Sequence, residues 1–251
     1  MSAKKNVKRH DPLRQLLETA ENKVLVEIIE DLAIMFPEVR RECFEYLKAH
    51  VKLSPGQKET SDGEAVFALW GELEPDLEEL DDYGGGDYSL ADHVADLFYQ
   101  IEEKLTKNKV PLEYRTNLLN EILPYIQSSN AGLDDQLYDV AYSCCYDNDD
   151  LRRLAGAFET IGNDWPIDHA RRIYKRIGDN TKYLQLRALK MEFGLDYHDL
   201  ATFYWKNGEE DKAINTVKDG LKKGVGRLDE LREFLSDRAQ ETGDLILHRS
   251  S

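Results

Sequence analysis

Residues 197–217 read YHDLATFYWKNGEEDKAINTV, and this stretch decides the fold of the chain. On both sides of Asn207-Gly208 the apolar and aromatic residues recur at steps of three and four, which is the spacing of one helix face. Glycine directly after such a pattern supplies the left-handed conformation that ends many helices. The stretch therefore predicts two helices joined by a short turn.

Glycines recur at regular intervals through the C-terminal half of the chain. They divide it into segments of 14 to 16 residues, each long enough for three to four helical turns and a short connection. We expect each glycine to end a helix, so that antiparallel helical hairpins follow one another in an all-α fold. The five positions are Gly162, Gly178, Gly194, Gly208 and Gly224.

The spacing Tyr197-x-x-Leu200-Ala201-x-x-Tyr204, followed by Ala213, resembles a tetratricopeptide unit. In that family a large, a small and an aromatic residue on the first helix pack against a small residue on the second. The resemblance implies hairpins stacked as a right-handed solenoid with a concave groove. A proline usual after the second helix is missing here, where Val225 stands.

Earlier segments repeat the first half of this pattern at decreasing strength. The clearest is Leu151-x-x-Leu154-Ala155-x-x-Phe158, with Gly162 after it. Two pairs of copies, at 94 and 140 and at 154 and 200, are offset by about 46 residues rather than the roughly 34 of a standard unit, so the intervening helices must be irregular. Weaker copies are Leu137-x-x-Val140-Ala141-x-x-Cys144 and Ala91-x-x-Val94-Ala95-x-x-Phe98.

The remaining patterns predict the organisation of the N-terminal part. Apolar residues at helical spacing indicate three helices that form one small packed unit, and the polar run SPGQKETSD at 54–62 indicates a linker. Ser61-x-x-Glu64 is a capping box that predicts a helix start, and Ser89-x-x-Asp92 predicts another after a glycine loop at 83–88. The predicted plan is a disordered basic tail at 1–12, a helical unit at 13–50, a linker at 51–63, a repeat domain at 64–243 and a C-terminal tail at 244–251.

The order of these parts also resembles the helical region that accompanies SWIM zinc fingers in prokaryotic proteins. The resemblance rests on residues 24–29 and 37–41, an acidic Asp/Gly loop, and LDELREFL at 228–235. The zinc finger itself needs a Cys-x-Cys pair with later Cys and His ligands, and the chain has none. Any zinc or nucleic-acid role of those proteins is therefore not carried over.

Composition argues against several classes of function. The 251 residues carry a formal net charge of −16, which repels nucleic-acid backbones and anionic lipid surfaces. No apolar run is long enough for a membrane span or a secretory signal, so we expect a cytoplasmic protein. Three cysteines without a CxxC pair predict reduced packing residues, with one of Cys144 and Cys145 facing the core and the other its flank.

No catalytic motif stands out, so the leading expectation is a protein that is not an enzyme and uses no cofactor. The glycines at 84–86 lack a Gly-Lys-Ser/Thr sequence and lie among aspartates, which predicts a flexible loop rather than a phosphate site. Asp149 or Asp150 is expected to cap the following helix. An alternative is a metal-dependent enzyme or regulator that uses the acidic loops 81–87 and 147–150.

The leading hypothesis is a protein-protein interaction module or scaffold that binds a peptide or partner protein in the concave groove. A further alternative is a self-associating structural scaffold, a homodimer for example, because incomplete repeat ends expose apolar faces. No metal, nucleic-acid or membrane contact is predicted. The groove candidates are the residues of each first helix that lie away from its packing set: Arg152, Glu159, His198, Thr202, Trp205 and Lys206.

Overall fold

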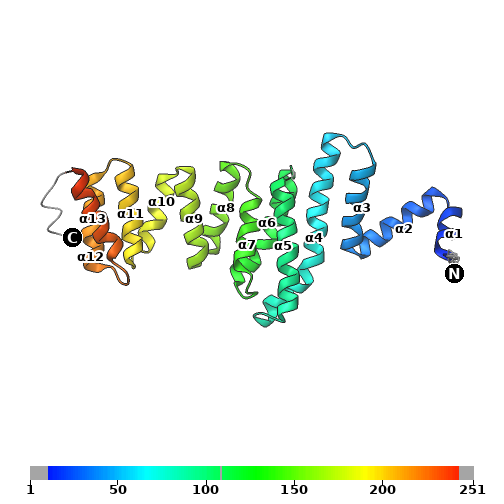
Figure 1. Cartoon of the computed structure of the whole chain (residues 1–251), viewed down its shortest axis with the longest axis horizontal. Helices are drawn as coiled ribbons and strands as arrows, with labels where there is room; N and C mark the ends of the chain where they lie inside the picture. The colour runs from blue at the N-terminus through cyan, green and yellow to red at the C-terminus, as the bar shows by residue number, and fades with distance from the viewer. Residues whose placement is uncertain (1–10, 108, 243–251) are drawn as a thin grey trace, which may run out of the picture. The chain divides into compact units, whose positions relative to one another are not determined.

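The computed structural model describes residues 11–107 and 109–242, and this part of the chain is all-α (Figure 1). Within it the only β pairing is a single bridge between Phe193 and Val225. The all-α prediction is thereby confirmed; the predicted tails at 1–10 and 244–251 lie outside the described residues. The helices are α1 (Pro12–Thr19), α2 (Asn22–Met35), α3 (Pro37–His50), α4 (Pro55–Tyr83), α5 (Tyr88–Lys107), α6 (Leu112–Ser128), α7 (Asp134–Ser143), α8 (Asn148–Ile161), α9 (Asp164–Ile177), α10 (Asn180–Leu189), α11 (Gly194–Lys206), α12 (Glu210–Lys223) and α13 (Asp229–Thr242).

The chain divides into two compact units between Asp150 and Leu151, inside α8. Unit 1 contains α1–α7 and the start of α8, and unit 2 contains the rest of α8 and α9–α13. In both units the helices pack against their neighbours in the chain or the next helix but one. The predicted repeat domain at 64–243 therefore extends over both units.

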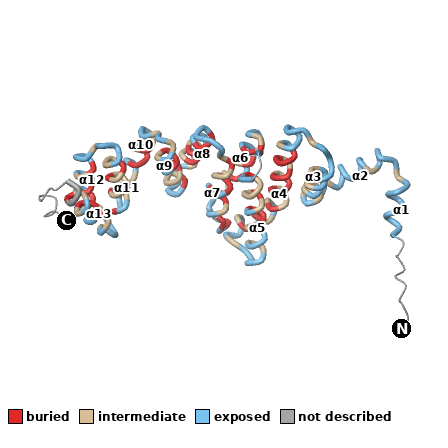
Figure 2. The backbone as a smooth tube through the Cα atoms, turned by 45° about the horizontal axis from the view of Figure 1, so that its top comes forward, coloured by how far each residue is buried: buried red, intermediate tan, exposed pale blue. Residues whose placement is uncertain are grey.

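The core of unit 1 is built on the long helix α4, which packs against α5 and α6, while α7 packs on α5 and α6. The ring of Trp70 lies between Phe98 and Tyr125, with centroid distances of 6.5 and 6.0 Å. Figure 2 shows the buried positions concentrated along α4–α7 in this unit. Every core leucine of α4 is 0% exposed: Leu69, Leu73, Leu77 and Leu80.

The predicted linker at 51–63 is wrong, because α4 already begins at Pro55. The helix start is a capping box of Ser54 and Gln57 rather than of Ser61 and Glu64, with the Gln57 amide donating to Ser54 Oγ at 3.4 Å. Pro55 in the first turn supports this start. A backbone N–H at that position would have no intrahelical acceptor, so proline loses no hydrogen bond there. Polar composition does not exclude a helix here, because neighbouring helices supply partners at the start of α4: Lys48 of α3 pairs with Asp62, and Tyr114 of α6 donates to the adjacent Glu64 at 3.0 Å.

The predicted glycine loop is confirmed, since α4 ends at Tyr83 and α5 begins at Tyr88. Gly84 takes a φ of 71° and closes α4 in the left-handed conformation. The cap of α5 differs from the prediction: Asp87, rather than Ser89, accepts the first free amide, with the Ser89 N–H donating to Asp87 Oδ1 at 2.9 Å. The Ser89 hydroxyl donates to the same carboxylate oxygen.

Helices α1–α3 form close to the predicted positions, although the basic tail ends earlier because Asp11 caps α1. The interpretation of a packed unit at 13–50 is wrong, because no residue of these three helices is buried. Helix α2 packs on α3, and α3 packs on α4. Ion pairs hold α3 in place, among them Arg40 with Glu64, and Arg41 with Glu72 at 3.2 Å.

In unit 2 the stretch 197–217 forms the predicted helical hairpin of α11 and α12, and α13 packs on both helices. The pattern residues Tyr197, Ala201 and Ala213 are buried in one cluster. Helix α13 completes this cluster with Leu231, Phe234 and Leu235. The small residues allow the helices to approach closely, which is why the spacing of large and small side chains predicts the hairpin.

Three of the five regularly spaced glycines of the C-terminal half end a helix in the left-handed conformation, as predicted: Gly162, Gly178 and Gly208. The prediction is wrong for Gly194, which begins α11. A Cβ on Gly194 would lie 2.2 Å from the carbonyl oxygen of Arg227, so the close approach of two backbones explains this glycine. Gly224 follows α12 but has an extended backbone with a φ of −70°.

Two glycines inside helices predict opposite effects of substitution by alanine. A Cβ on Gly220 would lie 2.6 Å from Tyr197 Cβ and 2.8 Å from Leu231 Cδ1, whereas one on Gly156 meets nothing within 4 Å. We expect Gly220→Ala to lower the free energy of unfolding by about 1–3 kcal/mol through overpacking. Gly156→Ala should raise it by about 0.5–1 kcal/mol, because alanine loses less backbone entropy in a helix. Urea unfolding followed by circular dichroism measures both; equal effects would contradict the close crossing of α11 and α12.

Candidate binding site

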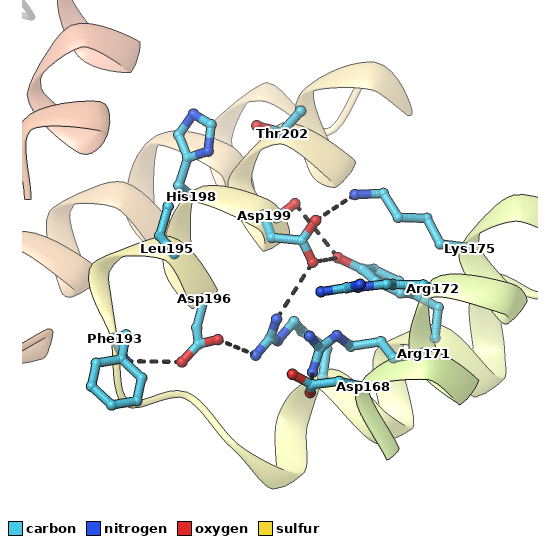
Figure 3. A pocket seen from close by; sticks show the side chains of 12 residues that line it. Asp168, Arg171, Arg172, Lys175, Phe193, Leu195, Asp196, His198, Asp199 and Thr202 are labelled. Atoms are coloured by element: carbon cyan, nitrogen blue, oxygen red, sulfur yellow. Dashed lines mark hydrogen bonds and ion pairs between the residues drawn. The ribbon is translucent and has the colours of Figure 1, made fainter. Parts of the chain in front are cut away.

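Unit 2 contains a cavity of about 500 Å³ that is lined by residues of α9, α10, α11 and the connection before α11 (Figure 3). Charged side chains of both signs surround it, with cations on α9 and α10 and two aspartates on α11. The lining residues are Asp168, Arg171, Arg172, Lys175, Tyr183, Arg187, Phe193, Leu195, Asp196, His198, Asp199 and Thr202.

Asp199 joins three helices at one side of the cavity. Its carboxylate accepts hydrogen bonds from Lys175 Nζ on α9 at 2.5 Å and from the Tyr183 hydroxyl on α10 at 2.8 Å. Burial raises the pKa of Asp199, but the hydrogen bonds from Lys175 and Tyr183 and the nearby Arg187 outweigh it, and the net pKa is lowered. Burial and the Asp199 charge raise the pKa of Tyr183, so its hydroxyl remains a donor.

Arg187 lies at the base of the cavity and is only 2% exposed. It pairs with Asp196 at 2.5 Å and with Asp199 at 3.5 Å, and it donates to the carbonyl of Lys190 at 2.8 Å. Asp196 in turn accepts the backbone N–H groups of Glu192 at 3.0 Å and Phe193 at 2.8 Å, which fixes the start of α11. This set connects the end of α10, the following loop and the first turn of α11.

The cations on α9 differ in how they are engaged. Arg171 pairs with Asp168 at 2.6 Å, and Lys175 is held by Asp199. Arg172 is exposed, and within the part of the chain that the structure describes it makes no hydrogen bond or ion pair. Figure 3 shows Arg172 extending from α9 toward the side chains of α11. Its guanidinium donors are therefore available to a bound group.

Two of the six groove residues predicted from the sequence, His198 and Thr202, line this cavity. The His198 ring packs edge-to-face on Phe234 with a centroid distance of 6.0 Å. Both residues lie one turn apart on α11, as the helical spacing requires. Sequence reasoning missed the cations of α9, for which the signal was the pair of arginines followed by lysine at 171–175.

The other four predicted residues are not among the lining residues of the cavity. Trp205 packs on Phe234 at 6.0 Å with the Arg238 guanidinium 5.1 Å from its ring centroid, so it belongs to the core between α11 and α13. Lys206 is exposed at the end of α11. On α8, Arg152 is exposed, and Glu159 pairs with Lys182 at 2.9 Å and accepts from the Tyr174 hydroxyl at 2.5 Å.

The acidic loop at 147–150 has a structural role that differs in part from the prediction. Asp147 caps α8, accepting the amides of Asp149 at 2.9 Å and Asp150 at 2.8 Å, where the sequence predicted Asp149 or Asp150 as the cap. Asp150 is buried and pairs with Arg115 of α6. Among the described residues, no three His, Cys, Asp or Glu side chains are arranged to hold a metal ion.

Arg115 closes a polar network at the end of α7 in unit 1. It donates to the carbonyls of Val110 at 3.1 Å and Cys144 at 2.6 Å, and its guanidinium lies 3.9 Å from the centroid of the Tyr146 ring. Cys144 is buried beside it and Cys145 is half-buried, in agreement with the predicted core and flank positions. Burial raises the pKa of the Cys144 thiol, so it does not ionise near neutral pH.

Known proteins supply no guide to this site. Comparison of the chain with models of protein families, with curated proteins and with solved structures found no match. The functional interpretation of the site therefore rests on its residues alone. None of the described helices has both the length and the apolar composition needed to cross a membrane.

The lowered pKa of Asp199 predicts a defined dependence of stability on pH. Because its folded pKa lies below the unfolded value of about 3.9, its contribution is fully present above that value and is lost as pH falls through the folded pKa. We expect Asp199→Asn to lower the free energy of unfolding by about 1–3 kcal/mol at neutral pH. The difference from wild type should shrink below about pH 4.

Denaturant unfolding from pH 7 to pH 3 measures this difference. Asp164→Asn is the matched control, since Asp164 pairs with Lys190 at 2.9 Å but is 85% exposed. Its effect should stay within about 0.5 kcal/mol at every pH. A difference for Asp199→Asn that is the same at pH 7 and pH 3 would contradict an ionised Asp199 in the folded protein.

Proposed function

We propose that unit 2 is a non-enzymatic protein-binding module whose cavity between α9 and α11 takes an acidic segment of a partner protein. In this proposal α8–α13 stack as a tetratricopeptide-like right-handed solenoid, and the cavity lies on its concave side. The observation that carries the proposal is the guanidinium of Arg172, which lines the cavity and is unpaired within the described residues. The proposal is consistent with a volume of about 500 Å³, which lies within the range of ligand sites.

The chemistry of the lining supports an acidic ligand. An arginine presents its donors in a planar fork that matches a carboxylate. The overall charge of −16 is unfavourable to an acidic partner at long range, so recognition would depend on close contact with this local group of cations. Phe193 and Leu195, which are 46% and 57% exposed at the cavity, offer an apolar surface for a side chain next to the carboxylate.

The internal hydrogen bonds of the site support binding rather than chemistry. Asp196, Asp199 and Arg187 are all occupied in joining α10 to α11, and Tyr183 donates to Asp199. Such a frame holds the lining in one arrangement, which lowers the entropic cost of binding. His198 and Thr202 supply further polar contacts from α11.

Reversal of the Arg172 charge should abolish most of this binding. We expect peptides selected on wild-type protein from a random displayed library to be enriched in Asp and Glu. Their dissociation constants, measured by fluorescence anisotropy, should rise at least about tenfold for Arg172→Glu, because a charge-assisted bidentate contact is lost.

Arg176→Glu provides the matched control, because it makes the same charge change on the same helix at an exposed residue that does not line the cavity. Its dissociation constants should remain within about twofold of wild type. Equal weakening by the two variants would indicate a general charge effect and contradict the proposed site. Selection of peptides without acidic residues would contradict the proposed ligand.

A further inference from the structure

The exposed aliphatic surface of the described chain is concentrated in α1–α3. Fourteen of the twenty-four large hydrophobic residues that are exposed in the described part lie between residues 13 and 51. Figure 2 shows this segment in the colours of exposed and intermediate residues, in contrast to the buried positions of α4. The most exposed of them are Ile34 at 77%, Leu16 at 67% and Tyr46 at 64%.

Helix α2 is apolar over more of its circumference than one neighbour can cover. At 100° per residue its apolar positions span an arc of roughly 280° from Val24 to Ile34, whereas a helix packed on one side needs an apolar stripe of about 100°. One part of the arc faces α3, where Ile29 and Ala33 line apolar hollows together with Cys43 and Leu47. The rest of the arc lies away from α3.

One exposed part of the arc is a regular stripe of Val24, Ile28, Leu32 and Met35, and Val26 and Ile34 are exposed outside this stripe. The four stripe residues are 51%, 45%, 37% and 60% exposed, and none of them lines the hollows at α3. Val24, Ile28 and Leu32 are four residues apart, so their side chains form one ridge along the helix. Outside the stripe, Lys23 pairs with Glu27 at 3.6 Å, and both side chains are exposed.

We propose that this stripe is a homodimer interface, in which α2 of one copy packs on α2 of a second copy across a two-fold axis. A ridge of residues four apart fits the groove beside the same ridge on an identical helix, which is the commonest geometry of helix packing. A two-fold interface requires a self-complementary surface, and this stripe meets that requirement. Leu13, Leu16 and Leu17 give α1 a further apolar face that extends the interface.

The area and composition of the surface favour a second copy over a transient partner. With about half of roughly 170 Å² exposed on each, the seven side chains of the stripe and of the α1 face present on the order of 600 Å² per copy, which reaches the lower bound of about 1,200 Å² in total for a stable interface. The surface is composed mainly of Leu, Ile and Val, and has neither Trp nor the unpaired Arg that anchor transient interfaces. Such a composition is that of a protein core divided in two, as in permanent homodimers.

The mass of the full chain in solution tests this interface. We expect light scattering coupled to size-exclusion chromatography to give twice the chain mass of 28.9 kDa for the wild type at micromolar concentration. Ile28→Glu combined with Leu32→Glu should give the mass of a single chain, with the same helix content by circular dichroism. The introduced carboxylates of the two copies would face and repel each other in the interface. If that variant loses helix content, Ile28→Ser with Leu32→Ser applies the same test without added charge.

Leu112→Glu with Leu189→Glu is the matched control, since it replaces two exposed leucines of α6 and α10 with the same acidic residue. This control should remain dimeric. A wild type of single chain mass would overturn the proposal and leave the stripe to a different protein. A dimer that persists in both α2 variants would also overturn it, by placing the interface elsewhere.

Discussion

The ion pair of Arg187 with Asp196 is the interaction on which the arrangement of unit 2 most depends. Helices that pack on near neighbours in the chain share no single core along the whole unit, so each junction is held locally. Arg187 is 2% exposed and bridges from α10 to α11, and Asp196 binds the backbone where α11 begins. Removing one partner of such a buried pair typically costs about 3–5 kcal/mol, because the other charge is left unpaired in the interior.

Unit 1 uses the same solution at its own junction. Arg115 is 8% exposed, and it joins the start of α6 to the end of α7 and to Asp150 at the start of α8. Both arginines donate to backbone carbonyls at the end of a helix as well as to a carboxylate. These carbonyls lack partners inside the helix, so the guanidinium satisfies two needs of the junction with one side chain.

The candidate site follows from this use of buried charge. Because Asp196 and Asp199 are committed to Arg187, Lys175 and Tyr183, the neighbouring Arg172 is left without a carboxylate partner among the residues that the structure describes. A local excess of positive charge thus arises in a chain of net charge −16. The unpaired Arg172 that distinguishes the cavity therefore results from the same ion pairs and hydrogen bonds that position α10 and α11.

The residues show why the sequence predicted the hairpins but not the site. Tyr197, Ala201 and Ala213 have a spacing that only a pair of close-packed helices explains, and the structure bears out the hairpin of α11 and α12. Local patterns also predicted the helix ends at Gly178 and Gly208. Whether Arg172 has a carboxylate partner, in contrast, depends on which carboxylates the other cations bind across three helices. No local sequence pattern contains that information.

At the start of α4, local sequence predicts a loop where residues distant in the chain stabilise a helix. Residues 54–62 are polar and predict a linker, yet residues 55–62 form helix: Lys48 of α3 partners the buried Asp62, and Tyr114 of α6 partners the half-buried Glu64 that follows. A polar helix segment is stable when distant residues supply its partners, so composition alone cannot separate it from a loop. In α2 the reverse holds: its apolar residues suggested burial, but a single neighbouring helix covers only part of the arc. The apolar stripe of α2 that the described part of the chain leaves exposed is the surface on which the proposed association rests.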